Sequence, residues 1–189
     1  RSPPRSRPGI ASGLTFQLDA AGEVPPECQG FADALEDARE RDEVGIAVAA
    51  FLREAYERVI LWTIRGTQAS AWIVHASTAP DIEPDRTPLE VSGVDALSRA
   101  TGTTAYLGPV GASNAADRAL LDKLLGGSAP LSAVSLPIHI GDRQIGIIYC
   151  DSGPGEAVAL DKTRLALVQR ELEGALRRVI LLRKRRRRH

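Results

Sequence analysis

Residues 133–151 read Ala-Val-Ser-Leu-Pro-Ile-His-Ile-Gly-Asp-Arg-Gln-Ile-Gly-Ile-Ile-Tyr-Cys-Asp, and this stretch decides the fold. Two runs rich in β-branched residues flank Gly141-Asp142, a dipeptide typical of two-residue hairpin turns. Glycine at the first turn position adopts a positive φ without steric cost. The stretch therefore predicts a tight β-hairpin in which Ile140 faces Arg143 and the pairing continues in regular register away from the turn.

A regular hairpin presents two different faces, because successive side chains of a strand point to opposite sides. One face is strongly apolar and suited to burial under helices: Val134, Leu136, Ile138, Ile140, Ile145, Ile147 and Tyr149. The other face is smaller and more mixed: Ser135, Pro137, His139, Gln144, Gly146, Ile148 and Cys150. We expect the mixed face to lie beneath a pocket or a layer of loops.

The rest of the chain supplies further strands and helices around this hairpin. Apolar spacing, β-branched runs and capping residues indicate where they begin and end. Helices are expected over about 31–39, 42–57, 92–100, 114–126 and 161–183, and strands over about 59–65, 69–77 and 89–91. The predicted fold class is α+β, with a mainly antiparallel central sheet, helices packed on one face, and loops and short helices on the other.

The length of 189 residues suits one domain with appended segments. We expect a flexible or extended N-terminal arm over residues 1–30. The domain is expected over residues 31–184, followed by a basic C-terminal tail over residues 185–189. The sequence contains no methionine and starts at Arg1, so we expect a piece of a longer protein.

Composition excludes several classes of function. The 24 basic and 24 acidic residues balance, so the molecule as a whole gives no case for specific nucleic-acid binding. No apolar run approaches the length of a transmembrane helix. Cys28 and Cys150 are far apart in sequence, which favours a reducing, cytoplasmic compartment over a disulfide framework.

The central hairpin resembles the end of a GAF domain. The resemblance rests on Ser135-Leu136-Pro137-Ile138, on Gln144-Ile145-Gly146-Ile147-Ile148-Tyr149-Cys150-Asp151, and on the long helix from Asp161. It covers roughly residues 42–184 and is similar to the divergent GAF-like modules of bacterial multidomain regulators. The resemblance implies a GAF-like fold and a non-catalytic sensory or regulatory role in signalling.

The resemblance does not carry over a known ligand. The patterns of cyclic-nucleotide GAF domains and of chromophore attachment are absent. If a ligand site exists, we expect it between the mixed hairpin face and the loops around Tyr106, where pockets typically combine apolar walls with a few polar groups. The candidate residues are Trp72, Tyr106, Ser135, His139 and Cys150. A pure interaction scaffold without a pocket is the first alternative.

A thiol redox enzyme using Cys150 is the second alternative. The end of the hairpin is similar to that of GAF-type methionine sulfoxide reductases, but the cysteine-bearing loop of those enzymes is missing. Asp151 beside Cys150 also opposes a reactive thiolate. No P-loop, HExxH, CxxC or GxSxG motif is present, and His75 and His139 have no further metal ligands at natural spacing, so no catalytic residue, metal or cofactor is expected.

The last helix carries apolar residues at alternating steps of three and four, which is coiled-coil spacing. We expect a homodimer contact along Leu165, Val168, Leu172, Ala175 and Val179. The alternative is that the same stripe covers the helix's own sheet. The basic run 183–188 is suited to an anionic surface, a phosphate or an acidic protein partner, or is simply a solvated helix end.

Overall fold

The computed structural model describes residues 13–19, 22–76 and 86–186. One seven-stranded sheet runs through the molecule in the order β1-β5-β6-β7-β2-β3-β4, and every neighbouring pair is antiparallel. The strands are β1 (Leu14–Gln17), β2 (Arg58–Arg65), β3 (Gln68–Ala76), β4 (Leu89–Glu90), β5 (Thr104–Gly108), β6 (Ala133–Ile140) and β7 (Arg143–Asp151).

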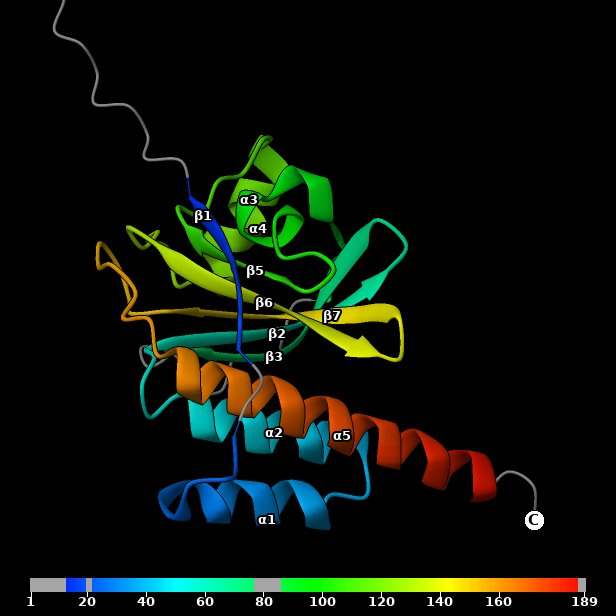
Figure 1. The fold of residues 1–189 in the computed structure, drawn as a ribbon. Coiled ribbons are helices and arrows are strands. Elements are labelled where there is room, and N and C mark those ends of the chain that lie inside the picture. The colour runs from blue at the N-terminus through cyan, green and yellow to red at the C-terminus, as the bar shows by residue number, and fades with distance from the viewer. Residues whose placement is uncertain (1–12, 20–21, 77–85, 187–189) are drawn as a thin grey trace, which may run out of the picture.

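Helices cover both faces of this sheet (Figure 1). On one face lie α2 (Arg41–Leu52) and α5 (Lys162–Arg186), with α1 (Gln29–Asp37) packed beyond them. On the other face lie the short helices α3 (Asp95–Ser98) and α4 (Ala115–Leu124) with their loops, and single 3₁₀ turns occur at Pro26–Cys28 and Val91–Gly93. The predicted α+β architecture is confirmed. None of the described helices combines the length and apolarity that a membrane span requires.

Two apolar cores result, one on each face of the sheet. The first core lies between the sheet and α1, α2 and α5, and it includes Leu35, Val48, Leu52, Val59, Leu61, Leu136, Ile148, Cys150, Leu165 and Leu172. The second core lies between the sheet and α3 and α4, and it includes Ile60, Trp62, Leu97, Tyr106, Leu121, Leu124, Ile147 and Tyr149. Both sheet faces are therefore buried.

The central hairpin forms where it was predicted, with Gly141 at φ 61° in the turn and Ile140 opposite Arg143. Its register differs from the regular one, because Ile138 pairs with Gly146 and Ile145 is the extra residue of a β-bulge. The bulge reverses the expected faces of the β7 residues beyond it. Ile147 and Tyr149 belong to the second core, whereas Ile148 and Cys150 face the helices in the first.

A second bulge interrupts the pairing of β2 with β3. Leu61 pairs with Ile73 and Trp62 with Ala71, so Trp72 is the extra residue. Trp72 and the next residue, Ile73, both pack with the first core, whereas Ala71 and Val74 on either side of them belong to the second. The bulge therefore places two successive side chains of β3 on the helix side, and Trp72 is one of them.

Part of the N-terminal segment joins the sheet. Residues 14–17 form the edge strand β1, which pairs with β5 from Leu14↔Leu107 to Gln17↔Thr104. Residues 14–17 of the flexible or extended arm predicted for residues 1–30 therefore pair with the sheet. Asn114 caps α4, because its side chain accepts a hydrogen bond from the backbone N–H of Asp117 at 2.8 Å.

The apolar stripe of α5 requires a correction. Its five predicted interface residues are all buried within this chain: Leu165, Val168, Leu172, Ala175 and Val179 are at most 2% exposed and belong to the first core. The helix therefore uses this stripe to cover its own sheet, which is the alternative that the spacing left open. Apolar residues at steps of three and four can pack against a second helix or against a sheet, so this spacing alone does not distinguish a dimer contact from core packing.

Candidate functional site

The five predicted ligand residues do not come together. Trp72 and Cys150 face the helices, on the side of the first core. Tyr106 belongs to the second core, and Ser135 pairs with it across β5 and β6. His139 lies near the hairpin turn, where its backbone N–H donates to Glu173 of α5 at 2.8 Å. The sheet itself separates the members of the predicted site.

The space expected to hold a ligand near Tyr106 contains packed side chains. The Tyr106 ring is 1% exposed, and its hydroxyl donates to the backbone oxygen of Pro109 at 2.9 Å. Tyr149 packs in the same core and donates its hydroxyl to Asp151 at 2.6 Å. The Oγ atom of Ser135 is buried and has no hydrogen-bond partner among the described residues.

A buried ion pair closes one end of this second face. The Nε of Arg58 donates to Asp151 at 2.7 Å, and its Nη1 donates to the backbone oxygens of Leu125 and Ser128 at 2.7 and 2.6 Å. Arg58 and Asp151 are at most 1% exposed. This network ties the segment after α4 to the sheet, and its buried position leaves it out of reach of a ligand in solution.

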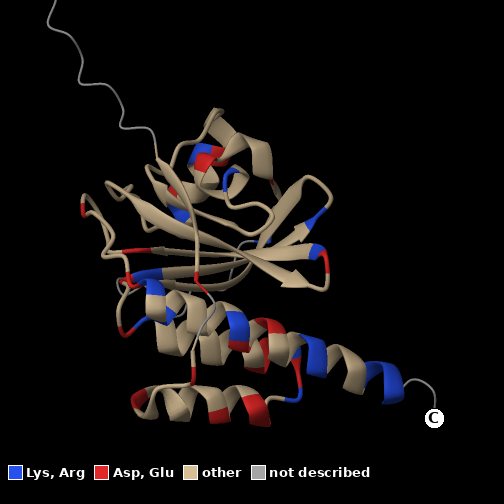
Figure 2. Cartoon of the chain, viewed as in Figure 1, with Lys and Arg blue, Asp and Glu red and all other residues tan. Residues whose placement is uncertain are grey.

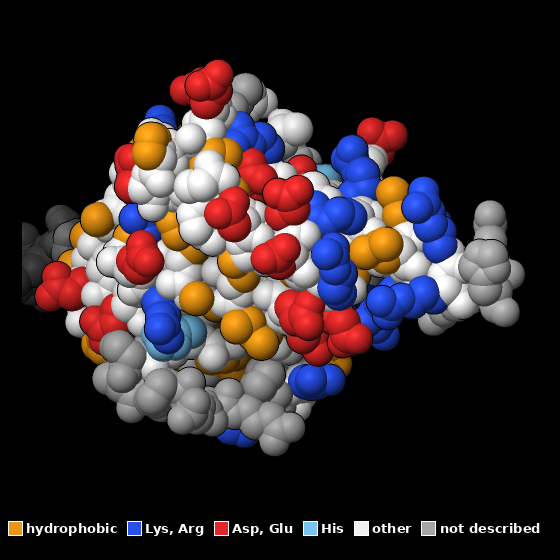
Figure 3. All heavy atoms as spheres, turned by 90° about the horizontal axis from the view of Figure 1, so that it is seen from below, with side chains coloured by type: hydrophobic (Ala, Val, Ile, Leu, Met, Phe, Trp, Pro, Cys, Tyr) orange, Lys and Arg blue, Asp and Glu red, His pale blue; other side chains and the backbone are white. Residues whose placement is uncertain are grey.

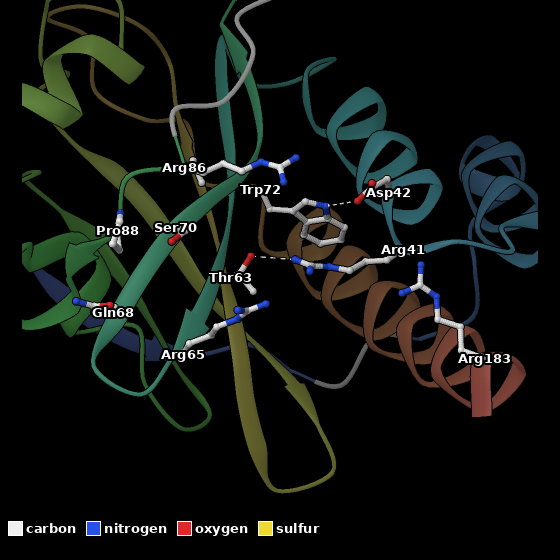
Figure 4. A pocket seen from close by; sticks show the side chains of 11 residues that line it. Arg41, Asp42, Thr63, Arg65, Gln68, Ser70, Trp72, Arg86, Pro88 and Arg183 are labelled. Atoms are coloured by element: carbon white, nitrogen blue, oxygen red, sulfur yellow. Dashed lines mark hydrogen bonds between the residues drawn. The ribbon is translucent and has the colours of Figure 1, made fainter. Parts of the chain in front are cut away.

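A cavity of about 550 Å³ lies on the helix side instead, between the start of α2, the β2–β3 hairpin and the end of α5. We call it the arginine cavity, because Arg41, Arg65, Arg86 and Arg183 all line it. Asp42 is the single acidic residue among its lining residues. Figure 4 shows these side chains approaching the cavity from different elements, with Arg183 reaching in from α5.

Arg41 is held in the cavity by two contacts. Its Nη2 donates to the Thr63 hydroxyl at 2.9 Å, and its guanidinium lies 4.1 Å from the centre of the Trp72 ring (Figure 4). Burial lowers the pKa of Arg41 below its ordinary value, the charge of Asp42 opposes this, and the nearby charges of Arg65, Arg183 and Arg86 lower it further. The cavity therefore concentrates positive charge.

Trp72 forms a rigid wall of the arginine cavity. Its indole N–H donates to the Asp42 carboxylate at 2.8 Å. This hydrogen bond engages one oxygen of the single acidic side chain that lines the cavity. Helix α2 approaches the ring closely at Gly45, where an added Cβ would lie 2.8 Å from Cζ2 of Trp72. Glu40 and Glu43 form the capping box of α2, which leaves Asp42 to hold the indole.

The arrangement is suited to binding an anion. Guanidinium groups present several N–H donors in a plane, which matches the oxygens of carboxylates and phosphates. Arg65, Arg86 and Arg183 form no ion pair with another residue of the described part of the chain. A preformed wall, one fixed guanidinium and three further cations are what such a site requires.

Burial changes the acid–base properties of Cys150 and His75. Cys150 is fully buried, and this burial raises the pKa of its thiol well above the ordinary value, as does the charge of Asp151. Burial and the charge of Arg53 lower the pKa of His75. Within the described ranges, no three His, Cys, Asp or Glu side chains are grouped to hold a metal ion.

The arginine cavity was not predicted from the sequence. Its four arginines are spread from residue 41 to residue 183, and no motif links them. Arg65 and Arg183 stand at the ends of a predicted strand and a predicted helix, but nothing in the sequence places them near each other. The bulge that turns Trp72 into the cavity has no signature in the alternating pattern of β3.

Comparison with known proteins identifies the fold. No family model matches the chain, and no curated protein matches it. Among solved structures, a segment of a methyl-accepting chemotaxis protein is 21% identical, with a TM-score of 0.62 over 81% of this chain and 97% of that one. The GAF domain of a two-component sensor histidine kinase from Bacillus halodurans is 12% identical, with a TM-score of 0.55 over 76% of this chain and 98% of that one.

An enzyme is also among the similar structures. Free methionine-R-sulfoxide reductase from Neisseria meningitidis is 10% identical, with a TM-score of 0.58 over 86% of this chain and 95% of that one. At these identities the likeness concerns the fold alone. The chain has a GAF-like fold, as its central hairpin predicted.

Proposed function

We propose that this GAF-like domain is a non-catalytic regulatory module that binds a small anionic ligand in the arginine cavity. One observation carries the proposal: four guanidinium groups surround one cavity that contains a single carboxylate, in a chain whose net charge is zero. Like charges held together lower the stability of the folded state. A bound anion would relieve that repulsion.

The position of Arg183 suggests how such a ligand would act. Arg183 lies near the end of α5, whereas Arg41 starts α2 and Arg65 ends β2. An anion that bridges these residues would hold the end of α5 against the sheet, and its release would free that end. Ligand binding would thereby change the position of the terminal helix, which is the physical requirement for a signal.

The other candidate functions have less support. A thiol redox enzyme needs an accessible thiolate, and Cys150 is buried with a raised pKa. A scaffold without a ligand has no use for converging arginines. We retain self-association through the terminal helices as a proposal, but it would use the exposed side of α5 instead of the buried stripe.

Titration calorimetry with inorganic pyrophosphate at low ionic strength tests the proposal. We expect saturable binding that weakens with salt, because screening reduces the attraction between partly exposed charges. Arg183→Gln and Arg65→Gln should each weaken binding about tenfold, since each removes a charge-assisted hydrogen bond.

Arg185→Gln is the matched control for this experiment. It removes the same charge from the same exposed end of α5, but Arg185 does not line the cavity. We expect it to change affinity less than twofold. Equal losses from Arg185→Gln and Arg183→Gln, or the absence of saturable binding, would contradict the proposed function.

A further inference from the structure

An apolar hollow adjoins the arginine cavity. It has a volume of about 270 Å³, and Arg41, Thr63, Arg65, Trp72 and Arg183 line both spaces. We call it the apolar trough after its other main walls, which are Ile138, Ile140, Ile145, Leu176, Val179 and Ile180. Arg143 of the hairpin also lines the trough, which lies between the tip of the β6–β7 hairpin and α5.

The two β-bulges of the sheet both build this region. Ile145 is the extra residue of one bulge, and it packs with the first core although Ile147, two residues later, belongs to the second. Trp72 is the extra residue of the other bulge and lines both spaces. Bulges concentrate beside functional sites, where they redirect a side chain. Two independent bulges aimed at one place indicate a built site.

The trough combines a buried floor with an accessible edge. Ile138 and Val179 are 1% and 2% exposed, whereas Ile180 is 37% exposed. A molecule lying there would cover apolar surface that now contacts water, which is favourable in proportion to the area removed. Three guanidinium groups line the end shared with the arginine cavity, and Arg143 is the one further charged residue among mostly apolar walls, so the two ends of the site differ.

We propose that the ligand is a free amphipathic anion, with a carboxylate or phosphate head among the arginines and one apolar tail in the trough. This inference rests on the proposed function, because the same arginines hold the head. The trough has room for a single tail of modest length, which is why a free single-chain molecule fits better than a two-chain lipid of a bilayer. The tail would pack between Ile145 and Ile180, and the Trp72 ring would lie at the junction with the head.

Affinity measured along a series of alkyl phosphates tests this inference. The probes are inorganic phosphate, butyl phosphate and octyl phosphate, each below the concentration at which it forms micelles. Burying a methylene group strengthens binding about fourfold when burial is complete. Because the trough is open along one edge, we expect about two- to fourfold per methylene, and no binding of an alkyl trimethylammonium ion of the same length.

Two variants separate the tail from the head. Ile180→Ser changes an exposed trough residue and should reduce the affinity for octyl phosphate about fivefold or more while leaving inorganic phosphate within twofold. Leu181→Ser is the matched control, because Leu181 is 53% exposed on the same helix and lines neither space. Ile145→Ser provides a second test from the hairpin side, and circular dichroism checks that each variant folds.

The outcomes distinguish this inference from the proposed function. If inorganic phosphate binds but the alkyl tail adds nothing, or if Leu181→Ser acts like Ile180→Ser, the amphipathic ligand is wrong and the anion site stands. If neither inorganic phosphate nor octyl phosphate binds, both proposals fail. Binding to anionic phosphatidylglycerol vesicles without binding to octyl phosphate would also overturn the inference, because the ligand would then be a surface.

Discussion

The two cysteines of the chain differ in their burial. Cys150 on β7 is fully buried in the first core, beside the buried ion pair of Asp151 with Arg58. Cys28 precedes α1 and is partly exposed. A thiol reacts as its thiolate, which burial in an apolar core disfavours. The environment of Cys150 therefore suits a small apolar core residue better than a nucleophile.

Replacing Cys150 by Ser should lower the free energy of unfolding by about 1–3 kcal/mol, because a hydroxyl enters an apolar site without an assured partner. Urea denaturation measures this, with Cys28→Ser as a control expected to stay within about 0.5 kcal/mol. In the native protein a thiol reagent should modify Cys28 well before Cys150. Rapid modification of native Cys150 at neutral pH would revive the redox alternative.

Helix α5 connects the core to the candidate site. Its buried stripe packs on the sheet, and the side chain of Gln169 donates to the backbone oxygen of Pro137 at 2.7 Å. Near the other end, Arg183 lines the arginine cavity. One helix thus supplies core packing along its length and a cation at its end. Apolar residues that remain exposed on it are Ile180 and Leu181.

The burial of the α5 stripe gives a prediction that separates packing from dimerisation. Val168→Glu combined with Leu172→Glu places two unpaired charges in the first core, at a cost of several kcal/mol each. Since a domain of this size is stable by about 5–15 kcal/mol, we expect loss of cooperative unfolding in circular dichroism. Leu181→Glu, at an exposed position, should remain folded.

Sedimentation velocity on the same variants tests the dimer contact that the sequence predicts along the apolar stripe of α5. A folded, monomeric Val168→Glu/Leu172→Glu protein would show that the stripe is an interface after all. If Leu181→Glu is monomeric while the unmodified protein is dimeric, the exposed side of α5 carries the contact.

The charge of the whole molecule is segregated although its sum is zero. Basic side chains gather around the projecting end of α5, and acidic ones lie along α1 (Figure 2). The view from below, onto the side of α1 and α5, also shows Lys and Arg side chains gathered toward the projecting end of α5, with acidic side chains beside them (Figure 3). The net charge of zero therefore hides a positive electrostatic potential near the arginine cavity.

The three tyrosines of the chain lie on both sides of the sheet, and all three are buried. At alkaline pH, we expect the tyrosines to ionise and the protein to unfold in the same transition. Burial raises the pKa of Tyr56, Tyr106 and Tyr149, because it disfavours the phenolate. A raised pKa in the folded state contributes stability that is complete below the unfolded value of about 10 and is lost as the pH rises beyond it. We therefore expect stability to fall above about pH 10.

Ultraviolet absorbance of the phenolate, recorded together with circular dichroism, checks this expectation. The three tyrosines should ionise together with the loss of the native spectrum. A tyrosine that titrates near pH 10 in protein with an intact spectrum would contradict the burial described here. Tyr106→Phe, which retains the ring but loses the bond to Pro109, should reduce the phenolate signal by one third of the total.

The sequence determined those features that depend on local chemistry. Gly141 set the hairpin turn, Asn114 capped its helix, and apolar periodicity located most of the strands and helices around residues 133–151. Turn residues and caps act through their own backbone and that of near neighbours, so their effect can be recognised without knowing the rest of the fold. The GAF-like architecture followed from these elements and their order.

The tertiary structure decided the register and the candidate site. A bulge at Ile145 reversed the faces of β7, and alternation could not reveal it because apolar residues stand on both sides of that strand. The arginine cavity depends on how α5 crosses the sheet, which brings Arg183 to Arg41 and Arg65. Such proximity is a property of packing between distant segments, and no spacing within any one segment contains it.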